Sequence, residues 1–599
     1  MQLCGGEIID FLIIFAFYYK LTDMKKRTGL AIIIAVTFTA VVTMGFLISQ
    51  ESKDFRLAKN LDIFYSLIRE INTFYVDDID PDKMIKTGID NMLKTLDPYT
   101  VYYPESNIDE LSLMTTGKYG GIGSLIRQNG DYVVISEVYK GFPADVAGIR
   151  AGDILKVADG ESLKGYSTEK VSEKLKGNPG TEIAITIERN GQDIDFKFKR
   201  ERIAMHPVPY FGMIDSKTGY IRFANFTQNG IEEIKIALTT LKSQNAQQII
   251  LDLRGNPGGL LDEAVSVVNL FVSQGNEVVS TKGKVKRFDE TYKTEKTAID
   301  ENIPLVVLIN RGSASASEIV AGALQDLDRA VIIGQRSFGK GLVQATRPLS
   351  YNTQLKVTTA KYYIPSGRCI QAIDFSRPNE DGSVGFIPDS LMKEFKTRNG
   401  RTVKDGGGIA PDIEMPYEIL SQITAELYMG NYIFDFATEY YWSRPNITSL
   451  EMFSFSDKDY DDFRDFLKKR NFSYKTLTEE SLDELIDVAK KEKYYDLHKE
   501  VFNALEKELA HGLDKDLDLF KEEIVELIES EIVTRYFYES GAIAYSIHKD
   551  EQIKKAVEIL NNKELYESIL KSGFTTSSVT KETTEDVNKI VINMRQTRN

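Results

Sequence analysis

The sequence predicts a multidomain α/β protein, and three properties of its 599 residues lead to that prediction. A single hydrophobic core rarely grows beyond about 250–300 residues, so a chain of this length is expected to divide into domains. Hydrophobic residues make up 42 % of the chain, which is enough for sizeable cores. The apolar pattern changes along the chain from helical to short strands, then to alternating strands and helices, and finally to helices alone. We therefore expect a helical arm, a β-rich domain, a layered α/β core and an all-helical C-terminal region.

An apolar segment near the N-terminus is long enough to cross a membrane. Residues 29–49 carry no charge, and Lys25, Lys26 and Arg27 precede them, which places the N-terminal side in the cytoplasm. We predict that residues 1–50 form a cytoplasmic stub and a transmembrane anchor or signal segment. The rest of the chain is then expected in the cell envelope, on the periplasmic or extracytoplasmic side of the inner membrane. A buried core helix is the alternative, which the flanking charges disfavour.

The next two regions differ in the spacing of their apolar residues. Residues 51–115 show helical periodicity and predict a helical arm. Residues 116–204 predict a β-rich domain with short helices. Within them Tyr132–Val138 alternates as a strand, Thr168–Lys176 is expected to be a helix, and Asn190-Gly191 suits the turn of a β-hairpin.

The remaining regions are an α/β core and a helical end. Residues 205–417 alternate apolar strands with helices, which indicates a layered α/β domain. Gln248–Leu253 and Pro304–Asn310 are its clearest buried strands, and a helical pattern follows each. Residues 418–573 are acidic, aromatic and helical, and residues 574–599 predict a flexible tail.

Charge and cysteine content exclude some classes of protein. The net charge of −15 and the pI near 5.1 argue against a nucleic-acid-binding surface, which is normally basic. The two cysteines, Cys4 and Cys369, lie far apart in the sequence and have no metal-ligand spacing. We expect no nucleic-acid partner, no metal and no cofactor.

A serine-rich segment lies between a predicted buried strand and a predicted helix. It runs from Arg311 to Glu318 as Arg-Gly-Ser-Ala-Ser-Ala-Ser-Glu. A serine at a helix N-terminus lies beside the positive end of the helix dipole, which stabilises developing negative charge. Ser315 followed by Glu318 also matches an ordinary capping box, and for this segment alone that is the competing interpretation.

The chain has few histidines that could activate a serine. Three of the four, His498, His511 and His548, lie in the predicted C-terminal helices, which leaves His206 near the α/β core. A Ser–His hydrolase that uses His206 is therefore a disfavoured alternative. A lysine whose pKa is lowered by desolvation can act as the base instead. Lys340 lies between two glycines after a predicted strand, although an ordinary loop lysine would also fit there.

Residues 334–340 also match the G-x-x-x-x-G-K pattern of a phosphate-binding loop. Gly341 stands where that loop needs a Ser or Thr hydroxyl for Mg²⁺, and residues 342–348 indicate a strand instead of the required helix. We therefore disfavour nucleotide binding.

A glycine-rich loop, Arg254–Gly259, follows the first buried strand of the core. Glycines let backbone N–H groups turn inward without obstruction, as an oxyanion hole requires. A tight strand-to-helix turn is the alternative role, and both roles are compatible.

Three segments of the core, residues 251–265, 307–344 and 361–370, resemble the carboxyl-terminal processing, or tail-specific, protease family. The resemblance covers residues 60–415 and implies a Ser–Lys serine endopeptidase that works through an acyl-enzyme without metal or ATP. By this resemblance Ser315 is the nucleophile, Lys340 the general base and Gln344 the residue that orients the lysine. The same resemblance makes the backbone N–H groups of Ala316 and Gly259 the oxyanion donors.

The β-rich domain resembles a PDZ domain in residues 141–155 and in its glycine-rich start. A loop of backbone N–H groups followed by a strand edge can hold a terminal carboxylate and add a peptide strand. A glycine turn in a small β-domain is the competing interpretation of the loop alone. The expected peptide-binding residues are Gly121, Ile122, Gly123, Ser124 and Leu125.

The expected substrates are therefore protein or peptide C-termini that the PDZ domain captures. The alternative is a non-catalytic PDZ scaffold that binds tails without cutting them. A protein that has lost an ancestral catalytic activity usually lacks the nucleophile or the base, whereas Ser315, Lys340 and Gln344 are all present. A regulatory adaptor and a homo-oligomer are further partners expected for the helical region.

Overall fold

The computed structural model describes residues 53–375, 384–416, 419–444 and 447–571. The chain divides near Asn91 into a small N-terminal unit and a large unit. Within the described ranges, no helix is both long and apolar enough to cross a membrane. The predicted anchor at residues 29–49 and the predicted tail at residues 574–599 lie outside these ranges.

The predicted helical arm is helical over only part of its length. Its helices are α3 (Lys53–Phe74), α4 (Pro81–Lys94) and α5 (Ile108–Thr116), with a 3₁₀ turn at Glu105–Asn107. Between α4 and α5 lies strand β1 (Val101–Tyr103), which belongs to the large unit and pairs antiparallel with β18 (Gln354–Tyr363). A strand within this arm was not predicted from the sequence. Val101 and the two tyrosines after it favour a strand, and prolines on both sides of them disfavour a helix.

The predicted PDZ domain is a sheet of order β3-β4-β5-β7-β8, with β6 paired to β5. Its apolar face packs around Val133, Ile135, Leu155 and Ile185, all nearly inaccessible to solvent. A two-stranded ribbon of β2 (Lys118–Gly121) and β9 (Glu201–Ala204) joins both ends of this domain. The elements of the sheet and its helices are β3 (Ser124–Asn129), β4 (Tyr132–Val138), α6 (Pro143–Ala147), β5 (Ile154–Ala158), β6 (Glu161–Ser162), α7 (Thr168–Leu175), β7 (Glu182–Arg189) and β8 (Gln192–Lys199).

The α/β core is built on a six-stranded sheet of order β10-β11-β12-β15-β16-β21. In this sheet β11, β12, β15, β16 and β21 run parallel to one another, and β10 is antiparallel at one edge. Parallel strands buried on both faces are continuous apolar runs, which is why β12 and β15 could be recognised in the sequence. The strands are β10 (Tyr210–Met213), β11 (Thr218–Arg222), β12 (Gln248–Asp252), β15 (Leu305–Ile309), β16 (Val331–Gly334) and β21 (Ile413–Glu414).

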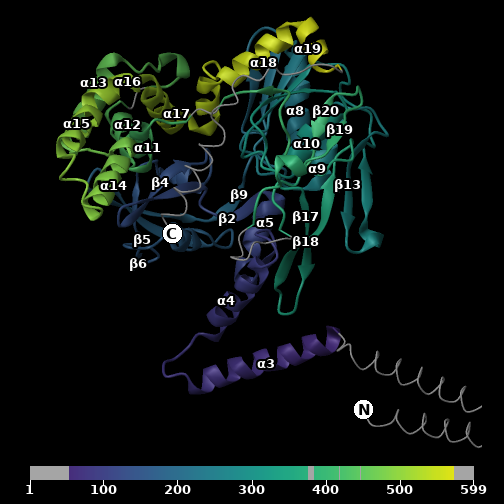
Figure 1. The fold of residues 1–599 in the computed structure, drawn as a ribbon, viewed down its shortest axis with the longest axis horizontal. Coiled ribbons are helices and arrows are strands. Elements are labelled where there is room, and N and C mark those ends of the chain that lie inside the picture. The colour runs from purple at the N-terminus through teal and green to yellow at the C-terminus, as the bar shows by residue number, and fades with distance from the viewer. Residues whose placement is uncertain (1–52, 376–383, 417–418, 445–446, 572–599) are drawn as a thin grey trace, which may run out of the picture. The chain divides into compact units, whose positions relative to one another are not determined.

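The two faces of this sheet are covered by helices from distant parts of the chain (Figure 1). Side chains such as Val307 face α8 (Gly230–Ser243), α9 (Leu261–Asn269) and α10 (Ala316–Asp326). The alternate side chains, such as Val306, pack against the C-terminal helices α18 (Glu551–Asn561) and α19 (Lys563–Ile569). The last two helices thus complete the core, although the sequence pattern groups them with the separate helical region.

A second sheet of order β1-β18-β13-β14, with β17 paired to β18, adjoins the core. Its further strands are β13 (Glu277–Gly283), β14 (Glu290–Lys293) and β17 (Leu342–Pro348), and a 3₁₀ turn covers Lys286–Phe288. A short hairpin, β19 (Glu394–Lys396) and β20 (Thr402–Lys404), follows later, after a 3₁₀ turn at Asp389–Leu391. In this sheet β1 pairs with the part of β18 (Gln354–Lys356) that also pairs with the end of β17.

The rest of the C-terminal region is a cluster of helices with an aromatic core that includes Phe436, Phe463 and Tyr460. It contacts the PDZ domain, because the Tyr538 hydroxyl donates to Asp145 at 3.1 Å. Tyr538 has a φ of 61° and a ψ of −175° and kinks α17 at this contact. The helices are α11 (Gln422–Met429), α12 (Tyr432–Ser443), α13 (Asp457–Lys469), α14 (Leu477–Lys491), α15 (Lys499–Leu509), α16 (Leu513–Leu519) and α17 (Lys521–Ser546), with a 3₁₀ turn at Leu450–Met452.

Candidate active site

Ser315 lies at the N-cap of α10, directly after the loop that leaves β15. Its backbone has a φ of 56° and a ψ of −113°, a conformation that a residue with a side chain rarely adopts. Such strain costs about 1–3 kcal/mol and persists only where the surroundings enforce it. α10 itself is buried along its whole length, so the positive end of its dipole acts at Ser315 in a low dielectric.

The glycine loop after β12 approaches Ser315 closely. A methyl group built on Gly258 would lie 2.7 Å from Ser315 Cβ and 2.9 Å from the backbone nitrogen of Ala316, so only glycine leaves room there. In the described part of the chain, no hydrogen bond takes up the backbone N–H of Gly259 or of Ala316. Both groups are available to a developing oxyanion.

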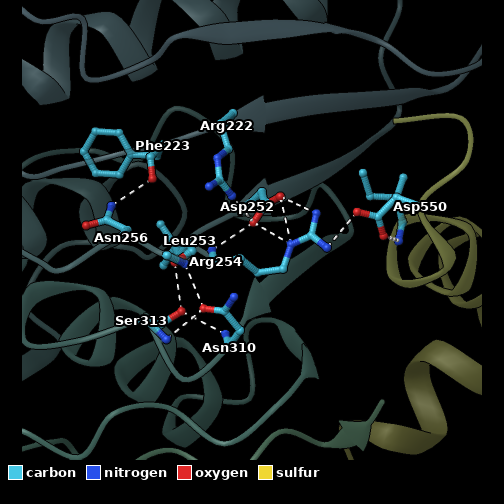
Figure 2. A network of polar contacts seen from close by, with 12 residues as sticks. Arg222, Phe223, Asp252, Leu253, Arg254, Asn256, Asn310, Ser313 and Asp550 are labelled. Carbon is cyan, nitrogen blue, oxygen red and sulfur yellow. Dashed lines mark hydrogen bonds and ion pairs between the residues drawn. The ribbon is translucent and has the colours of Figure 1, made fainter. Parts of the chain in front are cut away.

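Hydrogen bonds connect this loop to the loop that carries Ser315 (Figure 2). The side-chain oxygen of Asn310 accepts from the N–H groups of Gly255 and Gly312, at 2.8 and 3.0 Å. Ser313 donates through its hydroxyl to the carbonyl of Leu253 at 2.8 Å. The two loops are therefore fixed relative to one another by groups that have no role in the chemistry.

A buried cluster of charges anchors the start of the glycine loop (Figure 2). The carboxylate of Asp252 is inaccessible and pairs with Arg222 at 2.9 Å and with Arg254 at 2.6 Å. Burial alone would raise the pKa of Asp252, but the charges of Arg254 and Arg222 outweigh it and lower that pKa to about 2. Arg254 also reaches Asp550, at the N-cap of α18, with 2.7 Å between Nη1 and Oδ2. The C-terminal helices are thus tied to the loop that carries Gly259.

Glu318 connects the serine loop to the lysine loop. One oxygen of its inaccessible carboxylate, Oε2, accepts from the N–H of Ser315 at 2.8 Å and from the N–H of Lys340 at 3.0 Å. The other oxygen accepts from the Ser337 hydroxyl and from the Gly339 N–H, both at 2.6 Å. Burial raises the pKa of Glu318, and these hydrogen bonds oppose that rise. The capping box expected from the sequence is present, but the same carboxylate also brings the backbones of Ser315 and Lys340 together.

Lys340 lies in the turn between β16 and β17, with a glycine on each side in the left-handed region. A methyl group on Gly339 or Gly341 would approach Ala372 or Gln371 to 2.4 or 2.5 Å, so the turn requires both glycines. Burial lowers the pKa of Lys340 to about 8; the charge of Lys356 adds to this effect, whereas Glu318 and Asp97 oppose it. At mildly alkaline pH this amine can accept a proton.

Gln344, the residue that the resemblance assigns to orienting Lys340, lies on β17. Its side-chain amide donates to the hydroxyl of Thr358 on β18, at 3.2 Å. In the described part of the chain, no hydrogen bond joins Gln344 to Lys340, so any effect on the lysine would pass through neighbouring groups.

The competing interpretations find little support in the geometry. His206 is exposed and lies 3.3 Å from Glu233 rather than beside Ser315. The turn with Lys340 leads into strand β17, where a phosphate-binding loop would need a helix. Sequence reasoning missed Glu318 as more than a cap, although a glutamate followed by a run of apolar residues in a buried helix is a usable signal. It also missed Tyr99, whose ring contacts the side chain of Lys340.

The predicted peptide-binding residues lead from β2 into β3. Gly121, Ile122 and Gly123 are buried, and the carbonyl of Ile122 accepts from the N–H of Ala144 at 2.9 Å. β3 is an edge strand of its sheet, and α7 packs beside it. Leu125 is exposed on this strand, whereas the hydroxyl oxygen of Ser124 is buried without a hydrogen-bond partner in the described residues. A strand edge beside a glycine loop is suited to strand addition.

Comparisons with known protein families divide the chain in a similar way. Residues 217–381 match the model of peptidase family S41, and residues 134–189 match a PDZ domain. Residues 423–560 match the C-terminal helical domain of a probable PDZ-protease. That last match extends from the helical cluster into α18.

Comparisons with individual proteins agree with the family models. The carboxy-terminal-processing protease of Bartonella bacilliformis is 38% identical over 342 residues, which are 56% of this chain and 76% of that protein. A probable CtpA-like serine protease of Staphylococcus aureus is 34% identical over 65% of this chain and 80% of its own. The solved photosystem II D1 C-terminal processing protease is 28% identical over 60% of this chain and 93% of its own, with a TM-score of 0.32. On the strength of the two sequence relatives, this chain belongs to the carboxy-terminal-processing proteases of peptidase family S41.

Proposed function

We propose that this protease cuts peptide bonds with Ser315 as the nucleophile and Lys340 as the general base, after its PDZ domain has captured the C-terminus of a protein substrate. The observation that carries the assignment concerns Glu318. One oxygen of its carboxylate accepts from the backbone N–H groups of both Ser315 and Lys340. A shared buried acceptor fixes the two loops without pairing with the lysine side chain, which therefore keeps its reactivity.

The steps follow from the residues around Ser315. The neutral amine of Lys340 takes the proton of the Ser315 hydroxyl while the oxygen attacks the scissile carbonyl carbon. The tetrahedral oxyanion lies between the N–H groups of Gly259 and Ala316. As the C–N bond breaks, Lys340 returns the proton to the leaving amine and an acyl-enzyme remains. A water molecule then gives a proton to Lys340 and attacks the ester carbon. As the ester C–O bond breaks, Lys340 returns that proton to the Ser315 oxygen and the new C-terminus leaves.

The PDZ domain supplies the substrate to this site. The terminal carboxylate is held by the backbone of residues 121–123, and the preceding residues add to the edge of β3 beside Leu125. An apolar C-terminal side chain suits the apolar interior of this domain, whose core includes Ile122. The protein is then selective for tails rather than for a particular fold.

Cleavage of an unstructured protein with an apolar C-terminus tests the proposal. We expect the full chain to cut it and the variants Ser315→Ala and Lys340→Met to lose at least about 10³-fold in kcat/KM, as loss of a nucleophile or its base does in other serine enzymes. A substrate with an amidated C-terminus should raise KM and leave kcat nearly unchanged if the PDZ domain only binds. Full activity in either variant would contradict the catalytic assignment, and equal KM values would contradict the role of the PDZ domain.

The expected location is the cell envelope. The support is the apolar segment at residues 29–49 with its basic flank, which would leave the catalytic part on the outer side of the inner membrane. Fractionation of cells, followed by added protease acting on intact spheroplasts, tests this placement. An adaptor or a second copy bound to the helical region stays a prediction from the sequence.

A further inference from the structure

Tyr99, in the short segment before β1 (residues 97–100), lies over the side chain of Lys340. The Nζ atom of Lys340 is 4.8 Å from the centre of the Tyr99 ring. We propose that this segment is a fixed cover over the general base, with Tyr99 as a positioning residue that keeps water from the amine of Lys340. The inference rests on the proposed role of Lys340 and adds a residue that the α/β core itself does not supply.

Hydrogen bonds hold the cover in one conformation. The buried carboxylate of Asp97 accepts from the N–H groups of Tyr99 and Thr100, both at 2.8 Å, and from the Thr100 hydroxyl at 3.1 Å. The Tyr99 ring packs edge-to-face on Phe375, with 5.9 Å between the ring centres. A segment fixed in this way behaves as a wall of the site and not as a mobile loop.

The cover is also connected to the strand beside the lysine. The Thr100 hydroxyl oxygen accepts from the N–H of Thr358 on β18, at 3.2 Å. The side-chain hydroxyl of Thr358 in turn accepts from the side-chain amide of Gln344. Thr358 therefore connects the cover to the glutamine that the family resemblance places near the lysine, and pairing of β1 with β18 keeps the arrangement in register.

Water exclusion is the effect that matters for the base. The charged groups that act on the amine are Lys356 from β18, Glu318 from α10 and Asp97 from the cover, and the two carboxylates favour the ammonium form. The face of Tyr99 also attracts an ammonium ion. The pKa of Lys340 nevertheless lies near 8, so burial outweighs these attractions. Burial and the same two carboxylates raise the pKa of Tyr99 to about 12, so the ring is uncharged when the enzyme works.

The pH dependence of kcat/KM separates this role from simple packing. Removal of the ring in Tyr99→Ala admits water, so the midpoint of the rise in activity should move up by about one pH unit and activity at neutral pH should fall about tenfold. The plateau at high pH should stay within about threefold of the parent. Tyr99→Phe keeps the ring and should restore the parent midpoint. The matched control is Tyr495→Ala, which removes a ring 5.3 Å from Lys490 in the helical region and should change nothing.

The measurements use the full chain and include Lys340→Met. A lower plateau with an unmoved midpoint in Tyr99→Ala would show that the ring only packs, and would overturn the inference. If Tyr99→Ala does not fold, Tyr99→Gln, which admits water but keeps bulk, should show the same upward shift, and an unmoved midpoint there would equally overturn it. If Lys340→Met stays active, the base assignment and the cover both fail. If Lys340→Met is inactive while the midpoint of the Tyr99 variants does not move, only the cover fails.

Discussion

The two loops that meet around Ser315 each carry a charged residue, Asp252 fully buried and Lys340 partly buried, and the surroundings of the two residues are opposite in kind. On the oxyanion side, Asp252 is held between Arg222 and Arg254, and its pKa falls to about 2. On the other side, Lys340 has an aromatic ring above its amine and, among the described residues, no ion pair; its pKa falls to about 8. Both shifts are downward, but the first stabilises a charge and the second destabilises one.

The difference reflects the task of each loop. The glycine loop must hold the N–H group of Gly259 still, and a fully paired buried charge provides a rigid anchor. The base must change its protonation state in each cycle, which a paired ammonium would resist and an unpaired, desolvated amine allows. Stability is therefore expected to depend on charge in opposite senses at Asp252 and at Lys340.

The largest effect is expected on the paired side. Asp252→Asn keeps the shape of the side chain but leaves two arginines without their shared carboxylate, so the free energy of unfolding should fall by about 3–5 kcal/mol. Urea unfolding at neutral pH measures this free energy. Lys235→Ala, which removes an exposed pair with Glu232 on α8, is the control and should change it by no more than about 0.5 kcal/mol. A loss below about 1 kcal/mol for Asp252→Asn would mean that the cluster is not an anchor.

The unpaired side should respond in the opposite direction. Lys340→Met removes a charge that the fold disfavours, so the variant should be more stable by about 1–3 kcal/mol at pH 7 while losing activity. The pKa of Lys340 is about 8 in the folded chain and about 10.4 when unfolded, so between these values the unfolded chain binds more protons. The stability of the parent therefore rises with pH in that interval, and the advantage of Lys340→Met should shrink from pH 7 to pH 10. Urea unfolding of the parent and the variant at both pH values measures this difference. A variant that is less stable than the parent at pH 7 would contradict the prediction.

A smaller effect is expected where the C-terminal helices reach the oxyanion loop. In Asp550→Asn the side-chain oxygen can still cap α18 through the N–H groups of Gln552 and Ile553, but the ion pair with Arg254 is lost. We expect a loss of about 1 kcal/mol in unfolding free energy and a severalfold fall in kcat with little change in KM. Glu551→Gln, at an exposed pair next to it, is the control. Unchanged kcat would mean that the helices only cover the sheet.

The smallest effect concerns Lys356, whose charge lowers the pKa of Lys340 from a distance. Lys356→Gln should raise the midpoint of the pH–activity profile by about 0.3 units at low salt, and Lys356→Arg should leave it in place. The shift should become smaller in about 1 M salt, because salt partly screens the interaction between the two charges. A shift in the opposite direction would mean that Lys356 does not act through its charge.

Much of the fold could be predicted because its signals are local. β12 and β15 are continuous apolar runs buried on both faces, and Tyr132–Val138 has the period of a strand. The serine, the lysine and the glycine loop were candidates by residue type and place in the chain, and the family resemblance assigned their roles. These features need no knowledge of which segments meet in space.

What could not be predicted depends on contacts between distant segments. β1 is only three residues long, and its strand conformation comes from pairing with β18, some 250 positions later. The packing of α18 on the core could not be predicted from the sequence either. The apolar face of an amphipathic helix shows that the helix is partly buried, but not which sheet it packs against. For the same reason neither the pairing of Arg254 with Asp550 nor the contact of Tyr99 with Lys340 is contained in a local pattern.

The most direct test of the central claim is the pH dependence with which a serine-reactive probe labels Ser315. Probe labelling follows the first chemical step alone, so substrate capture by the PDZ domain does not enter. The rate should rise through about pH 8, level off above it, and be lost in Lys340→Met. A rate that is flat from pH 6 to 10, or that is equal in the parent and in Lys340→Met, would contradict an unpaired Lys340 as the base for Ser315.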